Sequence, residues 1–266
     1  MLYAGYLSRR LSLLAMLLCL SFSIDASQLL RFEGRALEPE SKTLLYTERH
    51  QVILDDQGNY ISSFVEYLDP LGEVFAEKTL DFSKSQIAPD LMFYDKRHEE
   101  RTTVTLQTSS GEDAYIRILN ERGAQREESR VDIDEDMVVI DAGFDRLITL
   151  NWPLLQEKKG VSFSFLAITR SQLLNFKVKK DAQTNQRVSL ELYPRNFFID
   201  LLVDPITLEY DLNTQRLMRF TGLTNIERYV DGKRSEENYL ADIYYQYQDI
   251  QAYTLIESGL SKVRSN

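Results

Sequence analysis

The sequence is poor in the residues that most often bind metals or act as nucleophiles: its 266 residues include one cysteine, two histidines and one tryptophan. Cys19 lies in an N-terminal segment that we expect to be removed, so the remaining chain has no thiol. Disulfides, thiol catalysis and cysteine-bound metals are thereby excluded. His50 and His98 stand in different segments, which argues against a histidine zinc site. We expect neither a metal nor a cofactor.

The strong catalytic motifs are missing too. There is no G-x-S-x-G elbow, no glycine-rich phosphate loop and no H-E-x-x-H pair. The acidic run from Asp132 to Asp136 lacks the central glycine and final glutamate of an EF-hand, so a solvated loop explains it better. These absences count against the commonest hydrolases and nucleotide-dependent enzymes, and we expect no enzymatic activity.

No apolar run reaches the roughly 20 residues that a membrane-spanning helix needs. The longest follows Arg9 and Arg10, covers residues 11–22, and leads to a small-residue exit at Ala26. This pattern predicts a secretory signal peptide over residues 1–26. A small residue is missing just before Cys19, which disfavours lipid attachment. We therefore predict a periplasmic protein without a transmembrane segment in its mature chain.

Negative charge predominates. The formal net charge is −10, and loss of the signal segment would bring it to about −11. Such a surface repels nucleic acid. We expect no nucleic acid among the partners, and instead a lipid or apolar small molecule, or a protein of the cell envelope.

The remaining chain, residues 27–266, reads as a single antiparallel β domain, because short runs of alternating apolar and polar residues are separated by turn signals. Predicted strands are Leu29–Leu37, Thr43–Leu54, Tyr60–Leu68, Glu73–Phe82, Thr102–Thr108, Ala114–Asn120, Val161–Thr169, Leu173–Lys179, Arg187–Tyr193, Thr207–Tyr210, Arg216–Phe220, Asn225–Val230 and Tyr239–Gln248.

Two short helices interrupt this pattern. Apolar residues recur at helical spacing from Phe144 to Leu155, with Asp141 expected as the N-cap and Pro153 limiting the length. A second helical turn is expected from Asn196 to Val203. We predict a large curved antiparallel sheet, a half-barrel or barrel-like structure that buries its apolar face around a helix. A two-sheet β-sandwich is the alternative.

Charged residues fall on the apolar face of two predicted strands. Glu48 and His50 share a face with Tyr46 and Val52, and Lys78 shares one with apolar neighbours in Glu73–Phe82. Because a buried unpaired charge is costly, these side chains should meet counter-charges or line a wet cavity. The candidate partners are Asp95, Arg97, Glu99, Asp141, Asp145 and Arg170. A ligand site and a structural ion-pair network both explain the pattern.

Three segments resemble those of uncharacterised exported proteins of Gram-negative bacteria: residues 44–50, residues 141–145 with Asn151 and Trp152, and residues 217–226. The overall plan, with a helix against a curved sheet, is more distantly similar to periplasmic half-barrels that carry lipoproteins or lipids. The second resemblance implies lipid handling and supplies no ligand residues.

Three functional hypotheses follow. The first is a periplasmic, non-enzymatic binding protein for an apolar or amphipathic ligand. The second is an envelope assembly factor that pairs an exposed edge strand, Tyr239–Gln248, with a partner. The third is a hydrolase of an envelope component that uses Asp141 and Asp145 as a carboxylate pair. For the first, the candidate ligand-binding residues are Glu48, His50, Lys78, Arg97, Asp141, Asp145 and Arg170, and no residue is assigned a catalytic role.

Overall fold

The computed structural model describes residues 27–108, 113–134, 137–157, 159–195, 206–230 and 233–253. The predicted signal segment and the helical turn expected at Asn196–Val203 lie outside these ranges. In the described part, no helix is long and apolar enough to cross a membrane.

Strands dominate the described residues, and all of them belong to one 16-stranded sheet. They are β1 (Ser27–Leu37), β2 (Leu44–Leu54), β3 (Tyr60–Leu68), β4 (Val74–Asp81), β5 (Asp90–Asp95), β6 (Glu100–Gln107), β7 (Tyr115–Arg122), β8 (Gln125–Asp132), β9 (Val138–Val139), β10 (Val161–Ala167), β11 (Gln172–Gln183), β12 (Arg187–Pro194), β13 (Ile206–Asp211), β14 (Leu217–Val230), β15 (Lys233–Tyr247) and β16 (Gln251–Tyr253). The helices are α1 (Gly143–Leu150), α2 (Trp152–Gln156) and a 3-10 turn, Ile168–Arg170.

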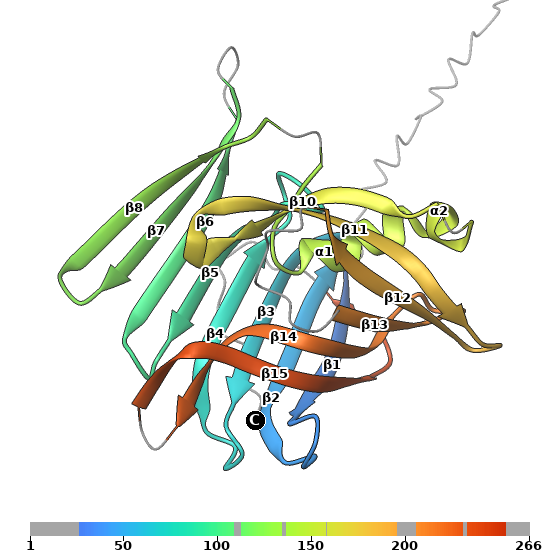
Figure 1. Ribbon diagram of the computed structural model, residues 1–266, viewed down its shortest axis with the longest axis horizontal. Coiled ribbons are helices and arrows are strands. Elements are labelled where there is room, and N and C mark those ends of the chain that lie inside the picture. The colour runs from blue at the N-terminus through green and yellow to red at the C-terminus, as the bar shows by residue number, and fades with distance from the viewer. Residues whose placement is uncertain are drawn as a thin grey trace, which may run out of the picture.

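The sheet has two arms that meet at β1. The first arm runs from β8 to β1 and the second from β15 to β9, and β1 pairs with β15 at the junction. All pairings are antiparallel except that of β9 with β10. In Figure 1 the second arm crosses in front of the first. The predicted curved antiparallel sheet with short helices is confirmed, and the two-sheet sandwich is wrong because every described strand shares one sheet.

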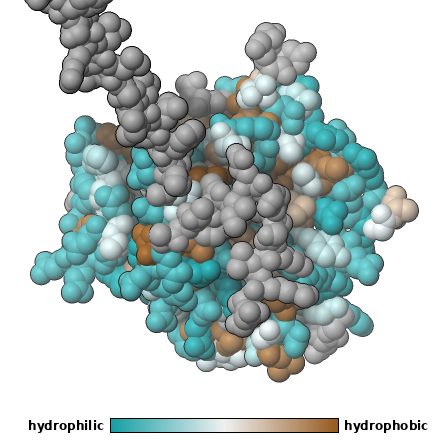
Figure 2. Space-filling model, turned by 180° about the vertical axis from the view of Figure 1, so that it is seen from behind, coloured by the Kyte–Doolittle hydropathy of each residue, from teal (hydrophilic) through white to brown (hydrophobic). Residues whose placement is uncertain are grey.

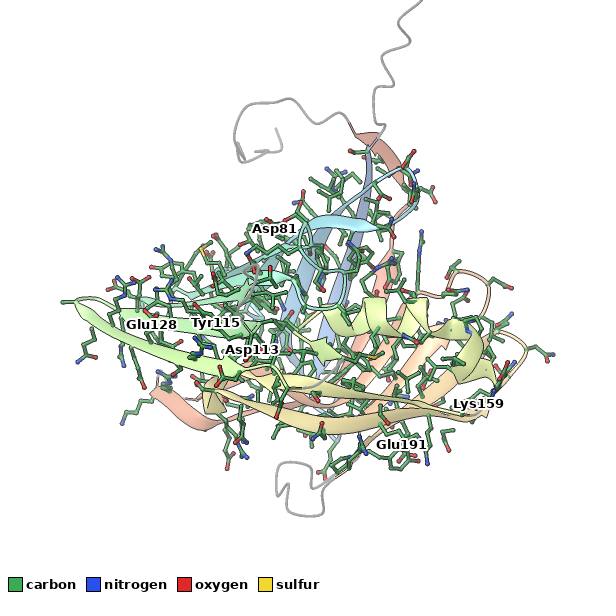
Figure 3. All side chains as sticks on the ribbon, turned by 90° about the horizontal axis from the view of Figure 1, so that it is seen from above. Asp81, Asp113, Tyr115, Glu128, Lys159 and Glu191 are labelled. Atoms are coloured by element: carbon green, nitrogen blue, oxygen red, sulfur yellow. The ribbon has the colours of Figure 1, made fainter. Side chains whose placement is uncertain are left out.

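Apolar side chains from both arms make the core. One cluster joins β4 to β7 with β9 and β10, through residues such as Ile116, Val138 and Leu166. Another packs α1 and α2 against β10 to β13. Seen from above, Glu128 and Tyr115 mark one end of the molecule and Lys159 and Glu191 the other (Figure 3). The two arms therefore pack against each other through side chains, and α1 lies between them, while the sheet stays open between β8 and β9.

The face of the molecule seen from behind is mostly polar where it is coloured. Its apolar residues form small separate groups (Figure 2). Isolated apolar residues on a surface are normal for a folded protein.

Four described strands, β5, β8, β9 and β16, have no counterpart in the sequence prediction. Two of them, β9 and β16, are only two and three residues long. β8 has only Val131 buried among charged and polar neighbours, so it lacks the alternating pattern. The segments predicted as Arg216–Phe220 and Asn225–Val230 form one long strand, β14, whose register with β15 shifts after Leu223. A bulge inserts extra residues without ending a strand.

The edge predicted at Tyr239–Gln248 is wrong. Most of that segment belongs to β15, which pairs with β14 on one side and β1 on the other. Among the described strands, β8 and β9 end the main order of the sheet, and the short β16 pairs with β1 alone. The charged side chains of β8 suit an edge, since charge on an edge strand discourages pairing with other chains.

Asp141 is not the helix N-cap. The cap of α1 is Ala142, whereas Asp141 has a left-handed backbone with φ 45° and its Oδ1 accepts a hydrogen bond from Ala142 N. Gly143 then passes so close to the loop before β5 that a Cβ would lie 2.0 Å from the carbonyl oxygen of Ile87. This approach anchors the start of α1 to the first arm.

Candidate functional site

The inward faces of β2 and β4 carry the charges that the sequence placed there. Glu48 is buried between buried Tyr46 and half-buried His50, and Lys78 is buried between Ala76 and Leu80. Alternation along a strand sends every second side chain to the same face. The predicted inward orientation is therefore confirmed.

Glu48 and His50 interact with each other. His50 Nε2 lies 2.8 Å from Glu48 Oε2, and the Tyr245 hydroxyl donates to the same oxygen at 3.3 Å. The His50 ring stacks on Phe32, with centroids 4.2 Å apart. Gly34 makes room for this group, because a Cβ there would lie 2.7 Å from Tyr245 Cε1 and 3.1 Å from Glu48 Oε2. The absence of a side chain at Gly34 lets β1 lie beneath the tyrosine ring.

Lys78 finds its counter-charge in Asp141, one of the candidate partners. Nζ and Oδ1 are 2.7 Å apart, and the two side chains are 8% and 5% exposed. Burial opposes the charge of Lys78, but the carboxylate of Asp141 and the nearby Tyr67 hydroxyl outweigh it and raise the Lys78 pKa. Asn225 Nδ2 donates to Asp141 Oδ2 at 2.9 Å from an exposed position on β14. This ion pair thus reaches the surface through Asn225.

Asp145 lies on the inner side of α1, where Tyr60 Oη donates to its Oδ2 at 3.0 Å. Burial raises the pKa of Asp145, and the hydrogen bond from Tyr60 opposes that shift. The Tyr210 hydroxyl lies beside the same carboxylate. Even so, neither Asp145 Oδ1 nor Tyr210 Oη has a partner of normal hydrogen-bond geometry among the described residues.

These groups are neighbours inside the curved sheet. His50 is near enough to Asp145 to lower its pKa, and Tyr67 lies within electrostatic range of Lys78 and Glu48. We call the whole set the interior polar cluster; its members are Glu48, His50, Tyr60, Tyr67, Lys78, Asp141, Asp145, Tyr210, Asn225 and Tyr245. The sequence thus predicted five residues that the fold does bring together.

The other two predicted ligand residues lie elsewhere. Arg97 binds Asp95 at the turn between β5 and β6, with Nη2 2.6 Å from Oδ2. Arg170 ends the 3-10 turn, is exposed, and has no ion pair with any residue that the structure describes. Glu99, a candidate counter-charge, is also exposed. Arg97 and Arg170 are therefore not part of the interior polar cluster.

The sequence analysis did not single out several members of this region. Tyr60, Tyr210 and Tyr245 looked like ordinary core residues, since tyrosines at strand spacing usually pack half-buried. Arg146 was also missed, although it is 9% exposed and binds the neutral oxygens of Asn59, Gln86 and Thr149. The sequence did offer a signal for Arg146, because it directly follows Asp145 in the predicted helix.

The arrangement favours binding over shared acid and base chemistry at the two aspartates. Asp141 is held by Lys78 and Asn225, while Asp145 interacts with tyrosines. Their partners differ, so the carboxylates do not share a proton or a cation. Hydroxyl, carboxylate and ammonium groups instead line one interior region, which suits the polar end of a ligand.

Comparison with known proteins gives limited information. No family model matches the sequence, and no curated protein matches it. The fold is similar to a crystal structure of a β-barrel-like protein of a domain of unknown function, DUF1849, from Brucella abortus. The TM-score is 0.38 and the sequence identity 7%, over 86% of this chain and 98% of that chain.

Proposed function

We propose that this protein is an exported, non-enzymatic binding protein for an amphipathic, lipid-like ligand, and that the interior polar cluster receives the ligand's polar end. Export to the periplasm rests on the predicted signal peptide. The binding role rests on the polar groups inside the curved sheet.

One observation carries the proposal: three buried oxygens in this region make no hydrogen bond of normal geometry within the described residues, although Tyr210 lies beside Asp145 and Tyr46 beside Thr224. They are Tyr46 Oη, Asp145 Oδ1 and Tyr210 Oη. A buried oxygen without a partner costs about 1–3 kcal/mol, so native proteins rarely keep several of them together unless something binds there. A ligand head group that donates hydrogen bonds would satisfy Asp145 Oδ1 and both hydroxyls.

The surroundings suit an amphipathic molecule. Apolar and aromatic side chains flank the cluster, among them Phe93, Phe220 and Ile226 in the core cluster that also contains Tyr46. Asn225 links the buried Asp141 to solvent beside the bulge in β14. That position offers an entry for a polar group followed by a chain.

Native mass spectrometry of the protein purified from periplasm tests the proposal. We expect a stoichiometric small molecule that solvent extraction releases and identifies as amphipathic. A clean ligand-free mass under conditions that preserve the fold would contradict it.

Tyr210→Phe and Tyr46→Phe are the sharpest variants, because each removes a buried hydroxyl that makes no hydrogen bond of normal geometry within the described residues. Lys78 is less suitable, since its loss would leave Asp141 unpaired. We expect the phenylalanine variants to keep their stability and lose ligand occupancy. Tyr193→Phe, whose hydroxyl binds Glu191 on the outer face, is the matched control. Unchanged occupancy in both interior variants would contradict the assigned site.

A further inference from the structure

A hollow of about 640 Å³ lies where the turn after β5 meets the hairpin between β7 and β8. The turn contributes residues 96–99, and the hairpin contributes Arg122, Gly123 and Gln125. Three of these side chains are cationic, one is a histidine and one, Glu99, is a carboxylate. Cationic groups therefore outnumber the carboxylate at the lining of the hollow, although the whole chain carries a net charge of −10.

Arg97 is fixed in place at this hollow. Its Nε and Nη2 donate to the buried carboxylate of Asp95, and its Nη1 donates to the carbonyl oxygen of Glu227 at 3.3 Å. Its guanidinium also lies over the rings of Phe75 and Tyr229, 4.3 and 5.4 Å from their centroids. These contacts use one N–H of each terminal nitrogen, and each terminal nitrogen carries two. Arg97 therefore presents further donors on a rigid support.

The other basic groups are less constrained. Arg122 is exposed and has no ion pair with the described residues. Lys96 is 39% exposed and reaches Glu77 at 2.7 Å, a type of surface pair that contributes little to stability. His98 Nε2 is buried and has no hydrogen-bond partner in the described part of the chain. Arg122 and Lys96 therefore have hydrogen-bonding capacity left for an anion.

We propose that this hollow binds a phosphate-type oxyanion. Arg97 supplies fixed donors, Arg122 supplies charge from the hairpin, and Lys96 supplies charge from the turn after β5. Donors from two separate turns suit a tetrahedral anion, whose oxygens point in several directions. A planar carboxylate needs only one arginine fork, which Asp95 already occupies.

This site is separate from the interior polar cluster, and neither proposal depends on the other. The phosphate has two possible sources: a soluble phosphorylated molecule or a phospholipid head group at a membrane surface. Both present the same charged group to the hollow, so the experiment must distinguish them.

The first measurement is an NMR titration of the labelled protein with inorganic phosphate, at an ionic strength held constant with chloride. We expect amide shifts centred on residues 96–99 and 122–125, with a dissociation constant on the order of 1 mM. Arg122→Gln should weaken binding about fivefold, equivalent to ~1 kcal/mol. The substitution should leave the fold intact, because Arg122 is exposed and unpaired.

Arg126→Gln is the matched control: Arg126 is exposed on the same hairpin but does not line the hollow. We expect the Arg126→Gln protein to bind phosphate with the same affinity as the unmodified protein. Absence of shifts at residues 96–99 and 122–125, equal shifts with chloride alone, or equal losses in the two variants would each overturn the proposal.

Flotation with vesicles identifies the source. Binding to phosphatidylglycerol vesicles, but not to phosphatidylcholine vesicles, that is lost in Arg122→Gln would support a lipid head group. Phosphate binding without vesicle binding would support a soluble phosphorylated ligand.

Discussion

Lys78 of β4 and Asp141, the residue two before α1, form an ion pair of 2.7 Å from which solvent is nearly excluded. The pair ties the first arm of the sheet to the helix that lies between the arms. Residues 63 positions apart in the chain are thereby fixed in one geometry. Neither side chain has another partner of opposite charge among the described ion pairs.

Removing either partner of this pair should be strongly destabilising. Lys78→Met leaves a buried carboxylate unpaired, and Asp141→Asn leaves a buried ammonium unpaired. Each should lower the free energy of unfolding by roughly 3–5 kcal/mol. In the double variant, the free energy of unfolding should fall by less than the sum of the two single losses, because no unpaired charge is left. Urea unfolding of the four proteins measures the coupling.

Glu77→Gln is the control on the same strand. Glu77 pairs with Lys96 at the same 2.7 Å, but the two side chains are 27% and 39% exposed. Glu77→Gln should therefore lower the free energy of unfolding by less than about 1 kcal/mol. If Lys78→Met is as stable as Glu77→Gln, the prediction that Lys78 and Asp141 form a buried, stabilising ion pair is wrong.

Asp145 should make stability fall as pH rises. Burial raises its pKa above the ordinary 3.8, so the folded state holds the proton more tightly than the unfolded state. The associated stability is present below pH 3.8 and is lost as pH rises through the folded-state value. Asp145→Asn, which cannot ionise, should therefore be more stable than the unmodified protein at neutral pH and gain no advantage near pH 3.

Denaturant midpoints measured from pH 3 to pH 7 test this expectation. If Asp145→Asn is the less stable protein at neutral pH, the fold stabilises the ionised carboxylate. That outcome would contradict the prediction that burial disfavours ionisation of Asp145. Asp134→Asn, at an exposed position, should follow the unmodified protein throughout.

Asp242 should have the opposite pH dependence. Burial disfavours its ionised form, but hydrogen bonds from Lys42, Thr221 and Arg219 outweigh burial and lower its pKa to about 2. Its ionised form stabilises the fold above pH 3.8, and this contribution, ~2 kcal/mol, is lost as pH falls towards 2.

Asp242→Asn should lose that contribution at neutral pH, and its stability should approach that of the unmodified protein near pH 2. Urea unfolding at several pH values measures the difference. Asp132→Asn serves as the control, because the Asp132 side chain is 75% exposed although it also pairs with an arginine. A constant difference between pH 2 and pH 7 would show that ionisation of Asp242 is not involved.

Sequence reasoning located the inward charges because a strand has a strict two-residue period. It placed Glu48, His50 and Lys78 on the core face, where the structure has them. It also named Asp141 among the partners of Lys78. It did not select Asp141 from the other candidates, because that choice depends on where α1 lies against β4, which strand periodicity does not encode.

The remaining errors have local physical causes. β8 was missed because an edge strand with one buried residue needs no alternating apolar pattern. Asp141 was taken for a cap because its type suits that position. Its left-handed backbone, however, places Ala142 at the cap. β15 was taken for an edge because its distant partner β1 leaves no signal in the sequence near β15.

The junction of β1 with β15 has a consequence for folding. Apart from the short ladder of β1 with β16, the other antiparallel ladders join strands that follow one another in the chain, so each can close without the rest of the chain. The junction instead joins Phe32–Leu37 to Asp242–Tyr247. Because a ribosome synthesises the N-terminal part first, β1 keeps an unpaired backbone edge until the last of these residues has emerged. Residues 242–247, followed by β16, which pairs with residues 27–29, therefore set the time at which β1 is protected from association with other chains.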